Sequence, residues 1–182
     1  RHDEHPDVGR ATTRAHWLQD ITLMKAANIN YIRLSHYTPA KGFIELCDEM
    51  GMYVGNEISL GGAGNLMYDP SFSNAVLQRS YETVVRDINS PSVIYWSIGN
   101  EDPLTTLHMA SVKSVKALDP TRPCIDTSGN YHVATDIFCV HDYEQNPEIF
   151  KEHYDKLMTE GTLFDNHAHR QTYTVSYTHL RA

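Results

Sequence analysis

Residues 92–103, SVIYWSIGNEDP, begin as an apolar run that leads directly into an amide and a carboxylate. The run is rich in β-branched and aromatic residues, which predicts a strand that is buried on both faces. Asn100 and Glu101 come at its carboxyl end, where parallel α/β sheets hold their reacting groups. A carboxyl group there can act as a general acid or base, and the neighbouring amide can hold a hydroxyl group. A plain polar turn that leaves the strand is the competing interpretation.

Polar residues follow the other predicted strands in the same way. These strands begin near Tyr31, Tyr53, Cys124 and Ile137, and the residues behind them are Ser35 to Tyr37, Asn56 and Glu57, Asp126 to Ser128, and His141 to Tyr143. A (β/α)8 barrel builds its active site in this manner, from one strand end after another. No G-x-G-x-x-G sequence follows a predicted strand, which disfavours a nucleotide-binding, doubly wound sheet.

Helices are predicted between these strands, at residues 12–28, 40–51, 71–89, 104–120 and 146–161. The alternation of strands and helices indicates βαβ units, a parallel sheet and the α/β class. In the third helix the apolar residues are expected to share the buried face; they are Val76, Leu77, Tyr81, Val84 and Val85. Residues 58–70 are rich in glycine and are predicted to form a loop.

Charge and composition disfavour several classes of function. The 182 residues carry a formal net charge of −8, from 23 acidic and 15 basic residues, which argues against nucleic acid as a partner. No apolar run approaches the roughly 20 residues that a membrane-spanning helix needs, so no membrane partner is expected. Cys47, Cys124 and Cys139 lie in apolar runs, which favours buried thiols over a disulfide framework or a zinc site.

Three segments together carry a resemblance to a known family. Residues 30–54, NYIRLSHYTPAKGFIELCDEMGMYV, and residues 87–101, DINSPSVIYWSIGNE, are similar to the two signatures of glycoside hydrolase family 2, the β-galactosidase and β-glucuronidase family. The His-rich opening, RHDEHPDVGRA, resembles the loop that precedes both signatures. The resemblance implies a (β/α)8 barrel that hydrolyses a β-glycosidic bond with retention. It implies a β-linked sugar as substrate, with β-galactosides favoured, and no cofactor.

The resemblance also assigns roles to residues. Glu101 would be the general acid/base, and Asn100 would hydrogen-bond the sugar 2-hydroxyl group. The remaining positions follow from the same motifs. His36 and His2 would line the sugar site, Arg33 would sit beneath the nucleophile carboxylate, and Tyr143 would hydrogen-bond that nucleophile.

The sequence departs from the family pattern at several places. Thr38 stands between Tyr37 and Pro39, where the signature reads His-Tyr-Pro. Gly61 and Ala63 occupy the positions at which metal-dependent members carry Glu and His, so no metal site is expected. The nucleophile glutamate should follow a seventh strand, and no matching segment precedes residue 172. The chain is therefore expected to lack the nucleophile and the last strands of the barrel, and to have little or no activity alone.

The domain organisation follows from these departures. Residues 1–171 are expected to form an incomplete catalytic barrel, and residues 172–182, TYTVSYTHLRA, resemble translated adapter sequence and are expected to be a non-native tail. Such a tail suggests a bacterial source, with the cytoplasm and the periplasm both open as the compartment. The parent protein is expected to carry flanking β-sandwich domains, and it could form oligomers.

Two other functions remain open from the sequence. A metal-dependent hydrolase on a similar barrel could draw its ligands from six residues, which are His2, His5, His36, Glu101, His141 and Asp142. Their spacing matches no metal-binding motif, and residues 2–5 do not read H-E-x-x-H. A non-catalytic carbohydrate-binding relative is the second alternative, and the adjacent Asn100 and Glu101 argue against it.

Overall fold

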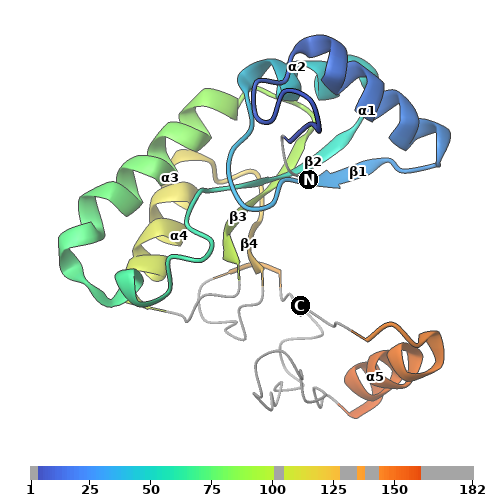
Figure 1. The fold of residues 1–182 in the computed structure, drawn as a ribbon. Helices are drawn as coiled ribbons and strands as arrows, with labels where there is room; N and C mark the ends of the chain where they lie inside the picture. Colours follow the sequence, from blue (N-terminus) through green and yellow to red (C-terminus); the bar gives the residue numbers. More distant parts are fainter. Residues whose placement is uncertain (1–3, 101–104, 128–134, 138–143, 161–182) are drawn as a thin grey trace. The chain divides into compact units, whose positions relative to one another are not determined.

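The computed structural model describes residues 4–100, 105–127, 135–137 and 144–160. The chain divides into two compact units, residues 1–138 and residues 139–182 (Figure 1). Within its described part, the second unit contains one helix, α5 (Pro147–Glu160), which agrees with the predicted fifth helix. None of the described helices combines the length and the apolar character that crossing a membrane requires.

The first unit is built on a parallel sheet. Its described strands are β1 (Tyr31–Arg33), β2 (Tyr53–Glu57), β3 (Val93–Asn100) and β4 (Cys124–Thr127), and their order in the sheet is β1-β2-β3-β4. All neighbouring pairs are parallel. Chain order and spatial order agree, as in the wall of a (β/α)8 barrel, whereas a doubly wound sheet reverses its order at a switch point. The α/β class and the partial barrel are thereby confirmed.

A fifth predicted strand, at residues 136–143, lies mostly outside the described residues. Its described part makes one parallel bridge, between Ile137 and Ile125 of β4. β3 also departs from the expectation of burial on both faces, because Ile94 is exposed near the beginning of the strand.

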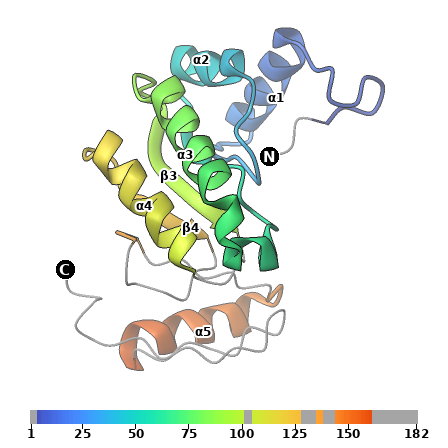
Figure 2. The same cartoon turned by 90° about the vertical axis from the view of Figure 1, so that its left-hand side faces the viewer.

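Helix α1 (Arg14–Ala26) precedes β1, and helices α2 (Lys41–Met50), α3 (Ser73–Asp87) and α4 (Thr106–Leu118) connect successive strands. Figure 2 shows α3 and α4 side by side along β3 and β4. The core between helices and sheet holds Phe43, Ile44, Val54, Trp96 and Ile98, among others. α2 ends at Gly51 in a left-handed conformation (φ +66°), which is the helix terminus that glycine favours.

The segment predicted to be a loop after β2 contains two short 3₁₀ helices, η1 (Gly64–Tyr68) and η2 (Pro70–Phe72). The second begins behind Asp69, whose side chain accepts a hydrogen bond from the backbone N–H of Ser71. A capping side chain followed by proline is a helix-start signal, so it outweighs the glycine content of the preceding residues.

The buried face of α3 differs from the predicted one. Val76 and Val84 are buried as expected, but the other three apolar residues are exposed by a third to a half of their surface: Leu77 36%, Tyr81 53% and Val85 47%. Buried polar residues occupy the face instead, namely Ser80, Thr83 and Asp87. Each has a hydrogen-bond partner on a neighbouring segment: Ser111, Thr38 and Asn56, respectively. These bonds offset the cost of burying the polar groups.

Two of the predicted buried thiols are described, and both are buried: Cys47 and Cys124. Burial, together with the nearby carboxylate of Asp136, raises the pKa of the Cys124 thiol to about 12. The thiol is therefore protonated at neutral pH and behaves as a small apolar side chain. Cys139 lies outside the described residues.

Buried Asp119 and partly buried Arg122 form an ion pair between α4 and the sheet. Arg122 donates to Asp119 Oδ2 at 2.7 Å, and the indole of Trp96 donates to the same oxygen at 2.9 Å. Arg122 also donates to main-chain carbonyls that surround the beginning of β3, those of Ile88, Ser90 and Val93. Burial alone would raise the pKa of Asp119, but hydrogen bonds from Thr121, Arg122 and Trp96 outweigh it and hold the pKa well below its ordinary range.

This ion pair predicts a pH dependence of stability. Because the pKa of Asp119 is lower in the folded chain, its carboxylate stabilises the fold above the ordinary pKa of about 3.9, and the contribution is lost as the pH falls below it. Replacing Asp119 by Asn is expected to cost about 2 kcal/mol at neutral pH and to flatten the decline in acid. Urea-unfolding midpoints across the acid range measure this, and parallel declines in the two proteins would contradict it.

Candidate active site

Three strands end on polar residues that contact one another. Arg33 is the last residue of β1, Glu57 the last of β2 and Asn100 the last of β3. Arg33 Nη2 donates to Glu57 Oε2 at 2.7 Å and to Asn100 Oδ1 at 2.6 Å, and its Nε donates to Glu57 Oε2 at 3.1 Å. The carboxyl ends of parallel strands lie at the same edge of the sheet, so Arg33 and Asn100, 67 positions apart in the chain, become neighbours.

An irregularity in β3 accounts for the position of Asn100. Ser97 pairs with Ile125, whereas Asn100 pairs with Thr127, so three steps along β3 match two steps along β4. Side chains alternate between the two faces of a strand, and Ser97 already contacts Glu57 on the inner face. Regular alternation would turn Asn100 to the opposite face. The extra residue reverses the alternation, and Asn100 joins Arg33 and Glu57.

Glu57 is the centre of the cluster and is completely buried, at 0% exposure. Besides Arg33, its carboxylate accepts a hydrogen bond from Ser97 Oγ at 3.0 Å, and His36 Nδ1 lies 2.9 Å from Oε1. An ionised carboxylate can only accept hydrogen bonds, so Nδ1 of His36 carries a proton in this contact. The charge of Glu57 is thus balanced by Arg33, whose side chain is 25% exposed, and its oxygens are satisfied from three residues.

The contact with Arg33 fixes which way the Asn100 amide faces. A guanidinium has only donors, so the atom facing it must be the carbonyl oxygen Oδ1. Nδ2, with its two N–H groups, is then the part of the amide that can serve a ligand. His36 is 39% exposed at its side chain and lies on the same cluster. The site therefore presents an amide donor and an imidazole above a buried ion pair.

The loop after β2 approaches this cluster with its backbone. A Cβ atom at Gly61 would lie 3.2 Å from the Cβ atoms of both His36 and Asn100, and 3.6 Å from Glu57 Oε1. A side chain at this position would require the neighbouring atoms to shift by a few tenths of an ångström. Gly61 supplies no carboxylate, and a larger residue there is sterically disfavoured. Ala63 offers no ligand atom either. The residues present do not fit the metal site of metal-dependent relatives.

The described residues also give no support to a histidine-based metal site. Across the described ranges, no three or more His, Cys, Asp or Glu side chains are grouped so as to hold a metal ion. The ring of His5 stacks on that of His16 at a centroid distance of 4.6 Å, and His36 contacts Glu57. The other four residues of that hypothesis, His2, Glu101, His141 and Asp142, lie outside the described residues.

Of the six residues predicted for the active site, the structure describes Arg33, His36 and Asn100 and brings them together through Glu57. Glu101, His2 and Tyr143 lie outside the described residues. The sequence interpretation placed Glu57 among the polar residues at the strand ends but gave it no individual role, and it did not single out Ser97. The available signal was a glutamate at the end of a short strand, and a serine inside the apolar run of residues 93–98.

A second layer of side chains lies beneath this cluster on the same face of the sheet. Tyr31, Gly55 and Tyr95 are each two residues before a member of the upper layer, so their side chains share its face. The hydroxyl groups of Tyr31 and Tyr95 are hydrogen bonded to each other across Gly55. A Cβ atom at Gly55 would overlap both hydroxyl groups, so the glycine makes this contact between non-adjacent strands possible.

Comparisons with known proteins point to one family. A family model described as glycosyl hydrolases family 2, TIM barrel domain, matches residues 1–179. A curated β-galactosidase of Vibrio cholerae is 40% identical over 162 residues, covering 83% of this chain and 16% of that protein. The first curated relatives are thus matched over only 14% to 16% of their length.

Solved structures give the same result. β-Glucuronidase 3 of Bacteroides uniformis is 31% identical with a TM-score of 0.60, and the match covers 68% of this chain and 17% of that one. A family 2 β-galacturonidase of Eisenbergiella tayi, bound to galacturonate, is 25% identical with a TM-score of 0.69, covering 88% and 32% of the two chains.

Proposed function

The chain belongs to glycosyl hydrolase family 2, and we propose that it forms part of the catalytic barrel of a retaining β-glycosidase that acts on β-galactosides. The observation that carries the proposal is the amide of Asn100, whose oxygen is bound by Arg33 so that its N–H groups can serve a ligand. Such an amide can donate to a sugar hydroxyl group, and a contact to the 2-hydroxyl strengthens in the oxocarbenium-like transition state.

Glu101 follows Asn100 directly and is the proposed general acid/base. In the first step its carboxylic acid protonates the leaving oxygen, while a nucleophile carboxylate on the other face of the sugar forms the glycosyl–enzyme bond. In the second step the Glu101 carboxylate takes a proton from a water molecule, whose oxygen bonds to the anomeric carbon while the glycosyl–enzyme bond breaks and the nucleophile carboxylate is released. The nucleophile is proposed to lie in a segment of the parent protein outside this chain. His36, His2 and Tyr143 complete the proposed sugar site, with Arg33 and the buried Glu57 beneath it.

The proposal extends to the organisation of the parent protein. Residues 1–171 are proposed to be an incomplete barrel, and the parent to carry flanking β-sandwich domains, which the small share of each relative covered by the chain supports. Residues 172–182 are proposed to be a non-native tail, although the family match extends to residue 179. Sequencing the gene from its source tests both statements.

A substitution at Asn100 tests the function in the full-length protein. We expect wild type to cleave an aryl β-galactoside, and Asn100→Ala to lower kcat/KM by about a hundredfold, because the contact to the 2-hydroxyl contributes several kcal/mol in the transition state. The matched control is the 2-deoxy substrate, on which wild type and variant should differ little, since the group that the amide binds is missing.

The possible results separate the hypotheses. An equal loss on the normal and the 2-deoxy substrate would show that Asn100 acts without the 2-hydroxyl contact. Sugar binding without turnover in wild type would favour the non-catalytic relative. Cleavage of β-glucuronides or another β-glycoside in place of β-galactosides would keep the mechanism and correct the substrate.

A further inference from the structure

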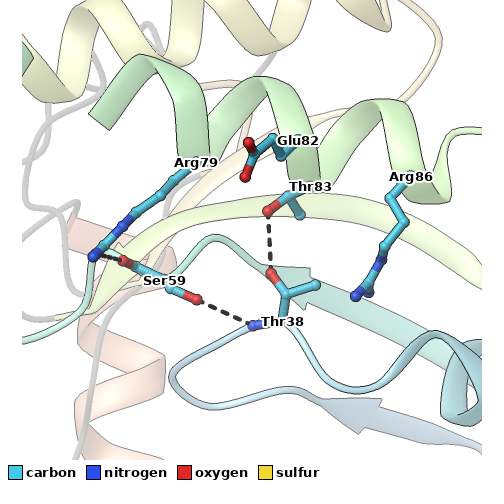
Figure 3. A pocket seen from close by; sticks show the side chains of 6 residues that line it. All are labelled: Thr38, Ser59, Arg79, Glu82, Thr83 and Arg86. Atoms are coloured by element: carbon cyan, nitrogen blue, oxygen red, sulfur yellow. Dashed lines mark hydrogen bonds between the residues drawn. The ribbon is translucent and has the colours of Figure 1, made fainter. Parts of the chain in front are cut away.

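A polar surface pocket of about 440 Å³ lies between α3 and the segments that follow β1 and β2. Six residues line it: Thr38, Ser59, Arg79, Glu82, Thr83 and Arg86. Figure 3 shows Arg79 and Thr83 of α3 joined to Ser59 and Thr38 by a chain of hydrogen bonds. The pocket wall is therefore a contact between a helix and the segments that carry His36 and Glu57.

The hydroxyl group of Thr38 is the centre of this contact. Thr38 Oγ1 donates to the main-chain carbonyl oxygen of Glu57 at 3.1 Å and lies 3.1 Å from Thr83 Oγ1. A hydroxyl group has a single proton, and that of Thr38 is used on Glu57. Thr83 must then be the donor to Thr38, so the bonds run in one direction from α3 to the end of β2.

Two further hydrogen bonds hold Ser59, two residues after Glu57. The backbone N–H of Thr38 donates to Ser59 Oγ at 3.3 Å, and Arg79 Nη1 donates to the carbonyl oxygen of Ser59 at 2.7 Å. Arg79 and Thr83 are both on α3, so the helix fixes the main chain of residues 57–59 at two carbonyl groups. Glu57 is thus held at both ends, its carboxylate by Arg33, His36 and Ser97, and its carbonyl oxygen by Thr38.

We propose that Thr38 and Thr83 are positioning residues that act through Glu57 on the active site, an inference that rests on the proposed function. A small displacement of the Glu57 main chain would move its carboxylate, and with it Arg33, which orients the Asn100 amide. Misplacement of reacting groups by about 1 Å lowers rates strongly. Thr38 stands where the family signature has proline, which has neither the N–H nor the hydroxyl group that this connection uses.

The test compares variants that keep the shape of the side chain with variants that keep the hydroxyl group. In the full-length protein, Thr38→Val and Thr83→Val remove the hydroxyl group, and Thr83→Ser retains it. The matched control is Ser80→Ala, because Ser80 is a buried residue of the same helix whose hydroxyl group lies 2.7 Å from that of Ser111 on α4. The readouts are kcat and KM on the aryl β-glycoside that wild type cleaves, and amide hydrogen exchange of peptides covering residues 36–40 and 57–60.

We expect each valine variant to lower kcat about five- to tenfold with a smaller change in KM, and to accelerate exchange in both peptides by a similar factor, as the loss of one buried hydrogen bond implies. Thr83→Ser should restore both readouts. Ser80→Ala should leave kcat and the exchange of these peptides unchanged.

Unchanged exchange in the valine variants would overturn the proposal. Faster exchange with unchanged kcat and KM would also overturn it, because the hydroxyl groups would then serve stability alone. If wild type cleaves no glycoside, the proposed function fails. The exchange data would then still show whether the hydrogen bonds from Thr83 through Thr38 hold the main chain of Glu57.

Discussion

Replacing Glu101 by Gln in the full-length protein is expected to lower kcat/KM by about a thousandfold on glycosides with poor leaving groups, and far less on activated aryl glycosides. General acid catalysis contributes about 10²- to 10⁴-fold, and a glutamine cannot transfer a proton to the leaving oxygen. An activated phenolate leaves without that proton, so the first step loses little on such substrates.

The measurement is kcat/KM on a series of aryl glycosides of increasing leaving-group pKa, together with its pH profile. The variant should show a steeper dependence on the leaving group and should lose the limb of the profile that reports the acid. Glu45→Gln on the exposed face of α2 makes the same chemical change away from the site and should match wild type. A loss that is equal across the series would mean that Glu101 is not the acid.

Replacing Glu57 by Ala is expected to destabilise the protein by about 3–5 kcal/mol and to abolish most of its activity, because Arg33 would lose its buried anionic partner. His36 and Ser97 would lose the same acceptor, and the Asn100 amide would remain bound to a guanidinium that is no longer fixed. Glu57→Gln keeps the shape and one acceptor oxygen and should cost less stability than Glu57→Ala.

Urea-unfolding midpoints and kcat/KM measure these effects. Glu49→Ala is the matched control, because it removes the carboxylate from an exposed Arg–Glu pair, that of Arg14 and Glu49, which is expected to contribute at most about 1 kcal/mol. The double variant Arg33→Met with Glu57→Leu should recover stability but not activity, since replacing both partners removes the unpaired charge. An unchanged midpoint in Glu57→Ala would contradict the assigned role of this carboxylate.

The sequence alone predicted the order of the elements well, because that order is encoded locally. Apolar periodicity located α2, the glycine at position 51 marked its end, and the apolar run located β3. The face that α3 buries was predicted only in part: Val76 and Val84 are buried, whereas Leu77, Tyr81 and Val85 are exposed. Periodicity counts apolar residues, whereas this helix buries Ser80, Thr83 and Asp87 because partners far away in the chain satisfy them.

The candidate site could be predicted only in part for the same reason. A strand end with Asn and Glu is visible in the sequence, and the family signatures indicate Arg33 and His36. The partner that joins them, Glu57, becomes evident only when β1, β2 and β3 stand side by side. The direction of Asn100 depends on an extra residue in β3, and strand alternation read from the sequence would turn its side chain the other way.

The two tyrosines that meet across Gly55 limit the depth of the site. Their hydroxyl groups lie one step below Arg33 and Glu57, so a ligand that reached further along the inner face of these strands would meet the two rings. Every substitution at Gly55 would place a Cβ atom against both hydroxyl groups. A larger or differently shaped substrate would therefore have to be accommodated sideways, through the segments that follow the strands, while the bottom of the site stays fixed.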